Sequence, residues 1–222
     1  MSDKPYNPLD KLNLGRSIEL AVLSRDKLPL ADVASIKGAG VYVLYYTGPF
    51  AAYAGINDGQ KPIYIGKAIP KGGRKGGLTK DSSIGKPMAD RLGQHASSID
   101  ECSNLELADF QVRHLMLDDV WIPLGENMLI ETFKPVWNRA IDGFGNKDPG
   151  KRRSKQYKSP WDVLHPGRNF TIKLADSGLT SDFVEQRVAD YFAGKKLQKL
   201  PKAIEEQQAE EVAEAEEAAD EV

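Results

Sequence analysis

The stretch GVYVLYY, residues 40–46, is rich in β-branched and aromatic side chains, which favours a β-strand over residues 41–46. A second stretch of this kind, PIYIGKA at residues 62–68, follows after a loop of glycine and small residues, 47–60. Because the connection between them is short, we expect the two strands to pair antiparallel. A third strand is expected over residues 109–117, where apolar side chains alternate with polar ones.

Helices are expected between and around these strands. In the first and the last of them, apolar residues recur at the spacing of an amphipathic helix. Pro135 ends the third, since a residue that precedes proline is disfavoured in a helix. The four expected helices cover residues 9–23, 88–99, 125–134 and 181–193. The sequence thus predicts an α/β (α+β) fold, with a small central antiparallel sheet of three strands flanked by helices.

The net charge of −2 conceals a strong separation of charge along the chain. Residues 203–222 hold nine of the 32 acidic residues and no basic one, which leaves the rest of the chain basic. Residues 61–80 contain six basic residues and no acidic one, and residues 147–158 contain six basic residues against one acid. A basic body with an acidic tail indicates a polyanionic partner, although an ordinary solvated surface can carry the same charges.

The composition excludes several classes of protein. Cys102 is the only cysteine, so the chain has no intramolecular disulfide and no cysteine cluster for zinc. No apolar run approaches the ~20 residues that a membrane-spanning helix needs. The first residues, MSDKPYNPLDKL, do not have the pattern of a secretory signal. We therefore expect a cytoplasmic protein that makes no membrane contact.

Residues that can carry chemistry follow one another in a fixed order along the expected strands and helices. They are GVY at 40–42, YIG at 64–66, Arg91 and His95 on one helix, Glu126 on the next, and KPVWN at 134–138. This order resembles the GIY-YIG nuclease family, and the resemblance covers about residues 38–146. It implies a nuclease core at 38–146 with a helical extension at 1–37. A basic loop and C-terminal helical extension that contacts DNA would cover 147–200, followed by an acidic tail at 201–222, expected to be disordered.

The resemblance implies a glutamate that binds the metal ion, and two glutamates compete for that role. Glu126 fits the family pattern because it lies twelve residues before Asn138, whereas Glu131 does not. Five residues at 100° each place Glu126 and Glu131 about 140° apart around a helix, so only one of them can face the site. We therefore assign Glu126 to a divalent ion, Mg²⁺ or Mn²⁺, with one ion per active site. The full predicted set of catalytic residues is Tyr42, Tyr64, Lys67, Arg91, His95, Glu126 and Asn138.

The chemistry of these side chains agrees with phosphodiester hydrolysis. Arg91 offers a planar guanidinium that suits a phosphoryl group, and His95, four residues later, shares its helix face. Tyrosine is a poor base at its usual pKa near 10. Beside a metal ion, an arginine and Lys67, its anion is favoured, so that Tyr42 can take a proton from water and pass it to His95.

Two departures from the family pattern narrow the resemblance. The interval from Tyr42 to Tyr64 is longer than usual, so the loop at 47–60 resembles an insertion. His95 stands where many members carry tyrosine; together with DGFGN at 142–146 and WDVLHPGR at 161–168, it resembles the type II restriction endonuclease branch. That branch implies a homodimer that cuts both strands of a short palindromic double-stranded DNA site, leaving 5′-phosphate and 3′-hydroxyl ends.

Two alternatives remain open from the sequence: a structure- or lesion-directed nicking nuclease of the same fold, and a catalytically inactive DNA-binding module. The basic segments supply candidate contacts to the DNA backbone, or else a solvated loop. These candidates are Lys71, Arg74, Lys75, Lys151, Arg152, Arg153 and Lys155. His114 and His165 are interpreted as structural.

Overall fold

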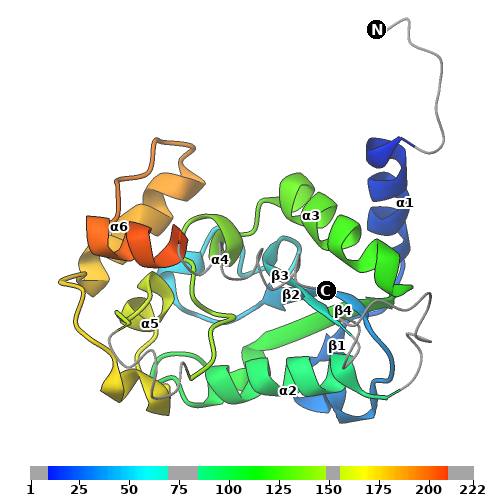
Figure 1. Ribbon diagram of the computed structural model, residues 1–222, viewed down its shortest axis with the longest axis horizontal. Helices are drawn as coiled ribbons and strands as arrows, with labels where there is room; N and C mark the ends of the chain where they lie inside the picture. Colours follow the sequence, from blue (N-terminus) through cyan, green and yellow to red (C-terminus); the bar gives the residue numbers. More distant parts are fainter. Residues whose placement is uncertain (1–9, 70–84, 149–155, 210–222) are drawn as a thin grey trace, which may run out of the picture.

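The computed structural model describes residues 10–69, 85–148 and 156–209 (Figure 1). Its centre is an antiparallel sheet in the order β1-β4-β2-β3. The predicted class, a small antiparallel sheet flanked by helices, is confirmed, and the predicted strands are those that pair: β2 (Gly40–Tyr46), β3 (Pro62–Ala68) and β4 (Phe110–Met116).

The predicted number of strands is wrong, because the described sheet has four strands instead of three. The additional strand, β1 (Leu28–Pro29), pairs with Val112 and Gln111 of β4. Two residues are too few to show a periodicity in the sequence, which explains why this strand was missed. Its proline stands on an edge strand, the place in a sheet where a missing backbone donor is tolerated.

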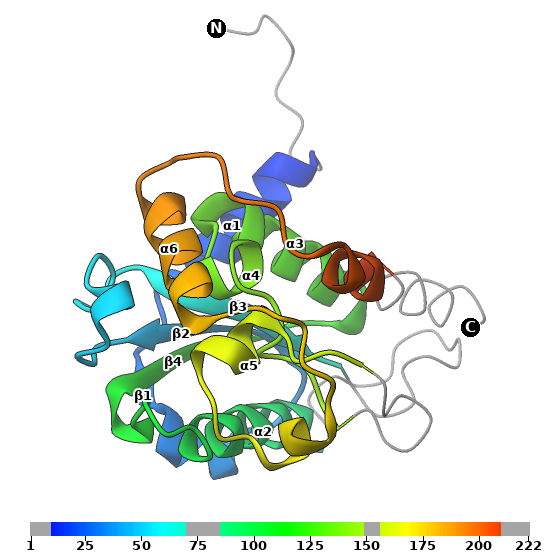
Figure 2. The same ribbon diagram turned by 90° about the vertical axis from the view of Figure 1, so that its left-hand side faces the viewer.

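The central strand β2 is buried along its whole length, because helices cover both faces of the sheet. Val41, Val43 and Tyr45 pack with α1 (Lys11–Leu23) and α3 (Ile122–Phe133) on one face. The alternate residues Tyr42, Leu44 and Tyr46 face a second core that includes α2 (Pro87–Asp100). Figure 1 and Figure 2 both show α1 and α3 on the side of the sheet opposite α2.

The predicted helices begin and end close to their predicted bounds, and between α3 and α6 the described chain forms two short helices that were not predicted. Those two are α4 (Val136–Arg139), directly after α3, and α5 (Pro160–Leu164). The last predicted helix is α6 (Ser181–Phe192), which begins at the N-cap residue Thr180. Short 3₁₀ segments occur at Leu30–Ser35, Ala51–Tyr53, Leu107–Asp109, Asp119–Trp121 and Asn169–Lys173. In the described part of the chain, no helix combines the length and the apolar character that crossing a membrane requires.

Residues toward both ends of the described chain pack into the folded body. Within the N-terminal extension, α1 packs on α3 so closely that a Cβ at Gly15 would collide with the side chain of Met128. After Pro201, where the folded body was expected to end, residues 202–209 are helical and Ile204 is buried. That expectation is therefore wrong for residues 202–209; the rest of the acidic tail, 210–222, lies outside the described residues.

Candidate active site

A cleft of about 450 Å³ opens between β2, β3, α2 and α3. It brings together five of the seven predicted catalytic residues, which come from four separate elements. These five are Tyr42, Tyr64, Lys67, Arg91 and Glu126. Of the other two, His95 lies behind Tyr42 in the core, and Asn138 lies against the outer edge of β3.

Two glycines allow the strands to hold Tyr42 in place. Gly66 lies opposite Tyr42 across β2 and β3, and a Cβ at Gly66 would collide with the Tyr42 hydroxyl and ring. Gly40 has a φ of 155°, and a Cβ there would collide with the carbonyl oxygen of Leu115 in β4. Both motifs therefore need glycine for steric reasons. Gly40 of GVY lets β2 approach β4, and Gly66 of YIG leaves room for the Tyr42 ring.

A hydrogen bond of 2.7 Å joins the Tyr42 hydroxyl to Nε2 of His95. Both side chains are buried. Burial raises the pKa of Tyr42 well above 10, since it disfavours the phenolate. Burial, with the charge of Arg91 nearby, lowers the pKa of His95 well below 6.5. The pair is therefore a phenol and a neutral imidazole at neutral pH.

Arg91 is the cation that faces both tyrosines. Burial raises the pKa of Tyr64 to about 12, and the Arg91 guanidinium opposes that rise as it does for Tyr42. Arg91 donates to the carbonyl oxygen of Gly145 at 3.1 Å and to Oε1 of Gln94 at 3.2 Å. These two contacts fix the guanidinium at the wall of the cleft, from which it can meet an anion.

The Glu126 carboxylate reaches the cleft from α3 and forms an ion pair of 2.6 Å with Lys67 of β3. Its side chain is 16% exposed. Glu131, by contrast, is 66% exposed and pairs with Arg139 at the surface, outside the cleft. The two glutamates of α3 thus face different surroundings, and only Glu126 can share a ligand with Tyr42 and Arg91.

The donor set in the cleft suits a metal ion held by few protein groups. Among the described residues there is no group of three or more His, Cys, Asp or Glu side chains that could enclose an ion. Mg²⁺ commonly binds through one or two carboxylates and completes its shell with water and substrate phosphates. Glu126 fits such an ion, so that the substrate would supply ligands that the protein lacks.

Asn138 does not line the cleft. Its side-chain amide accepts a hydrogen bond from the backbone N–H of Ile65 and donates one to the Ile65 carbonyl, both at 2.9 Å. Ile65 lies between Tyr64 and Gly66 on β3, the outer strand of the described sheet. Asn138 therefore completes the pairing of β3 and positions this strand from outside the cleft.

Several residues of the site were not singled out in the sequence. Phe144 stacks on His95 with ring centroids 4.4 Å apart and an interplanar angle of 16°. Gly145 and Lys147, from the same segment, line the cleft, as does Gln94 of α2. In the sequence, DGFGN contributes only to the resemblance; its aromatic residue between two glycines is the available signal for a backbone that approaches the site.

The predicted DNA-backbone contacts cannot be placed on this surface. The residues concerned lie outside the described residues: Lys71, Arg74 and Lys75 in one basic segment, and Lys151, Arg152, Arg153 and Lys155 in the other.

Comparison with known proteins agrees with the geometry of the cleft. A family model described as the Eco29kI GIY-YIG domain, a restriction endonuclease family, matches residues 34–192, more than half of the chain. No curated protein matches the chain. The matched range includes all the cleft residues described above, and it also extends through α5 and α6.

Proposed function

Because the chain belongs to the Eco29kI family of GIY-YIG restriction endonucleases, we propose that it hydrolyses both strands of a short palindromic site in double-stranded DNA. The products would carry 5′-phosphate and 3′-hydroxyl ends. The observation that supports this proposal most strongly is the cleft itself, where Tyr42, Arg91 and Glu126 converge from β2, α2 and α3.

In this mechanism Arg91 binds the scissile phosphate. Its guanidinium offers paired donors in a plane, and two hydrogen bonds to Gly145 and Gln94 already hold its orientation. An arginine that is fixed before the substrate arrives stabilises the charge that develops on the phosphate without reorganising during the reaction. Tyr64, which lines the same cleft, lies beside Arg91 and can donate its hydroxyl proton to a phosphate oxygen.

Tyr42 is the group that takes the proton of the attacking water. Its raised pKa keeps it protonated in the free protein, and its hydroxyl is hydrogen-bonded to the imidazole of His95. A neutral imidazole can accept the phenolic proton when positive charge near Tyr42 favours the phenolate. A divalent ion held by Glu126 would supply that charge and would help to neutralise the phosphate. Lys67, through its ion pair, keeps the Glu126 carboxylate turned into the cleft.

The proposed partner is DNA bound by two copies of this chain. A palindromic site has two-fold symmetry, which a homodimer with one active site in each subunit matches. The basic segments at 61–80 and 147–158 would hold the DNA backbone. Replacing Arg152 and Arg153 by alanine should weaken binding and flatten the dependence of log K on log salt by up to about two units, since each phosphate contact contributes about −0.9. If the dependence of log K on log salt is unchanged, residues 147–158 are a solvated loop that does not contact the DNA backbone.

The central experiment is digestion of a supercoiled plasmid with Mg²⁺. Discrete linear fragments support the proposal, and sequencing their ends would give the recognition site and the stagger of the cuts. Nicked circles alone would instead support a structure- or lesion-directed nicking nuclease. Intact plasmid, tested over DNA of varied sequence and with Mn²⁺ as well, would support a DNA-binding module without activity.

A further inference from the structure

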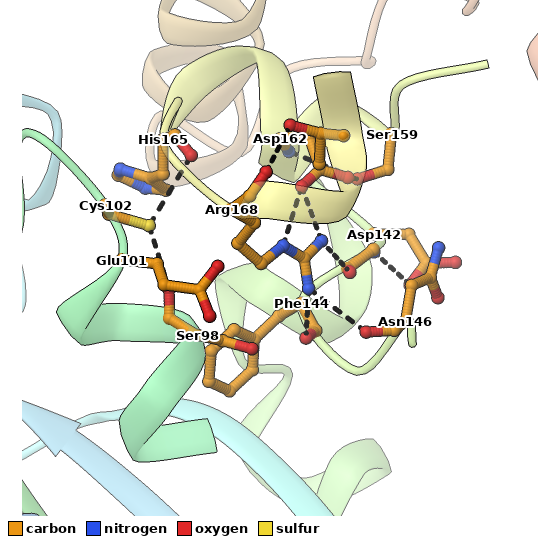
Figure 3. A network of polar contacts seen from close by, with 12 residues as sticks. Ser98, Glu101, Cys102, Asp142, Phe144, Asn146, Ser159, Asp162, His165 and Arg168 are labelled. Carbon is orange, nitrogen blue, oxygen red and sulfur yellow. Dashed lines mark hydrogen bonds and ion pairs between the residues drawn. The ribbon is translucent and has the colours of Figure 1, made fainter. Parts of the chain in front are cut away.

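An ion pair lies buried outside the cleft, between α5 and the residue Arg168 (Figure 3). Its side chains are 1% and 2% exposed, and Nη2 of Arg168 lies 2.6 Å from Oδ1 of Asp162. Nε of Arg168 donates to the same oxygen at 2.7 Å, and the Ser159 hydroxyl donates to Oδ2 at 2.6 Å. Removing two charges from water is costly, and a buried ion pair is therefore weak evidence for a stabilising role alone.

The rest of the Arg168 guanidinium binds the backbone of one loop. Nη1 donates to the carbonyl oxygens of Phe144 at 3.1 Å and Asn146 at 3.2 Å, and Nη2 donates to that of Gly143 at 2.9 Å. Figure 3 shows the guanidinium between Asp162 on α5 and this loop. One side chain thus fixes three carbonyl groups within four consecutive residues. A lysine in its place cannot do this, because it lacks the planar set of donors.

The same loop, residues 143–146, reaches the active site on its other side. The carbonyl oxygen of Gly145 accepts the hydrogen bond from Nη2 of Arg91, and the ring of Phe144 stacks on His95. Phe144 also contacts Tyr64 edge to face, with ring centroids 4.9 Å apart. The loop therefore touches the phosphate-binding guanidinium, the imidazole and a cleft tyrosine through two adjacent residues.

We propose that Arg168 and Asp162 are positioning residues for the cleavage reaction, which hold loop 143–146 so that Arg91 and His95 keep their places at the cleft. This inference rests on the proposed function. Asp162 orients Arg168, Arg168 fixes the loop carbonyls, and the loop fixes Arg91 through Gly145 and His95 through Phe144. Neither residue of the ion pair touches the substrate in this arrangement.

A second buried network in the same core provides a matched control. Tyr53 is hydrogen-bonded to His165 and accepts from Nε1 of Trp137, and His165 is hydrogen-bonded to Asn104. Tyr53, Trp137 and His165 are as deeply buried as Arg168, and none of the hydrogen bonds of this network reaches loop 143–146. Tyr53→Phe therefore removes buried hydrogen bonds from the core but none from the loop, and the Trp137 ring that packs on Phe144, with ring centroids 4.5 Å apart, is unchanged in its side chain.

The test compares Arg168→Lys and Asp162→Asn with Tyr53→Phe, at a temperature well below the unfolding midpoint of each variant. Displacing a catalytic group by about 1 Å can cost about 10²-fold in rate, and we expect a loss of that order in single-turnover cleavage at saturating DNA for both loop variants. Their Kd for a DNA duplex in EDTA, measured by fluorescence anisotropy, should stay within about threefold of the wild type. Tyr53→Phe should cleave at the wild-type rate. Wild-type cleavage by Arg168→Lys and Asp162→Asn would overturn the inference.

The double variant Arg168→Met with Asp162→Leu separates positioning from stability. Apolar side chains of similar volume often replace a buried ion pair without loss of stability, but they cannot bind the loop carbonyls. The loop carbonyls lose their donors, so we expect a folded variant that is less stable than the wild type and that cleaves as slowly as the single variants, at a temperature well below its unfolding midpoint. A folded variant that cleaves at the wild-type rate would overturn the inference.

A readout without cleavage distinguishes this inference from the proposed function. The imidazole ¹⁵N resonances of His95 should shift in Arg168→Lys, because Phe144 no longer holds the ring against Tyr42, and should not shift in Tyr53→Phe. An inactive wild type would contradict the proposed function, while the His95 resonances would still test the positioning. Unchanged His95 resonances in Arg168→Lys would contradict the positioning even in an active enzyme.

Discussion

The protein contains two buried pairs of tyrosine and histidine that are alike in their bonding. Tyr42 is joined to Nε2 of His95 at 2.7 Å, and Tyr53 to Nε2 of His165 at 2.5 Å. All four side chains are at most 1% exposed. In both pairs burial raises the pKa of the tyrosine well above 10 and lowers that of the histidine.

The pairs differ in what surrounds them. The Tyr53 hydroxyl also accepts from Trp137, and the other ring nitrogen of His165 is hydrogen-bonded to Asn104, so the polar atoms of this pair are all bonded to protein side chains. Tyr42 borders a cleft that also holds Arg91 and the ion pair of Lys67 with Glu126. A hydrogen bond between tyrosine and histidine is therefore not sufficient for catalysis. The cleft pair differs because groups that can bind a phosphate or a metal ion, Arg91 and Glu126, lie beside it.

The strongest test of this comparison removes the carboxylate of Glu126, which lines the cleft beside Tyr42. Glu126→Gln should lower single-turnover cleavage by about 10³-fold or more, because a metal ion contributes several kcal/mol of transition-state stabilisation and each 1.36 kcal/mol is tenfold in rate. DNA binding should be unchanged or tighter, since a charge that repels phosphate is lost. The matched control is Glu131→Gln on the same helix, whose exposed ion pair contributes little to stability. An inactive Glu131→Gln with a normal Glu126→Gln would reverse our assignment.

The second test removes one hydroxyl from each pair. Tyr42→Phe should lower the cleavage rate by about 10²-fold or more, which is typical for loss of a general base. Tyr53→Phe should leave the rate unchanged and lower the free energy of unfolding by about 1–3 kcal/mol, because Trp137 and His165 lose a buried partner. Urea unfolding and single-turnover kinetics on both variants measure the two effects separately. Equal rates for the two variants would mean that the two pairs do not differ in function.

The third test moves Tyr42 without changing it. Gly66→Ala places a Cβ against the Tyr42 hydroxyl and ring, so we expect a loss of about 10–10²-fold in rate from a displaced general base. Gly93 is the matched control: it lies on α2 between Arg91 and His95, and a Cβ there meets nothing within 4 Å. Gly93→Ala should cleave normally and gain about 0.5–1 kcal/mol of stability. A Gly66→Ala enzyme with full activity would show that the close contact of Tyr42 with the strand is not needed.

The sequence predicted the cleft better than it predicted the surroundings of the cleft. The strands and the fold class followed from local periodicity and from motif order, and the structure confirms them. The two-residue strand β1 and the short helices α4 and α5 could not be predicted in the same way, because their formation depends on contacts with distant elements. The loop at 47–60 illustrates this: it resembled an insertion, yet its Tyr53 is fully buried beside Trp137.

Roles that depend on a partner far away in the chain were also beyond the sequence. Asn138 was placed among the catalytic groups because it ends a motif, but its amide pairs with the backbone of β3. Arg168 was part of a string that marked a resemblance, and only the fold brings its guanidinium to the carbonyls of residues 143–146. Asn138 and Arg168 both bind backbone groups of distant segments, and a pattern of side chains in the sequence does not show such contacts.

The smallest expected effect is on the pH dependence of stability. It tests whether the two histidines contribute equally to the free energy of unfolding although the two pairs differ in function. Burial lowers the pKa of His165 to about 3 and that of His95 well below 6.5, whereas both titrate near 6.5 in the unfolded chain. The unfolded chain then binds more protons below pH 6.5, so the stability is fully present above pH 6.5 and falls with the pH down towards 3.

Each histidine should contribute up to about 1.4 kcal/mol per pH unit in that window, and the raised pKa of Asp142 opposes them in part. Urea unfolding at pH 7.5, 6.5, 5.5 and 4.5 measures the slope of the free energy of unfolding against pH. His95→Asn and His165→Asn should each reduce this slope by a similar amount, because each removes one histidine that is buried in its neutral form. Only His95→Asn should also slow cleavage, by about tenfold or more if it accepts the proton of Tyr42. A flatter slope in one variant alone would show that the two pairs already differ in the free protein, before DNA or a metal ion is bound.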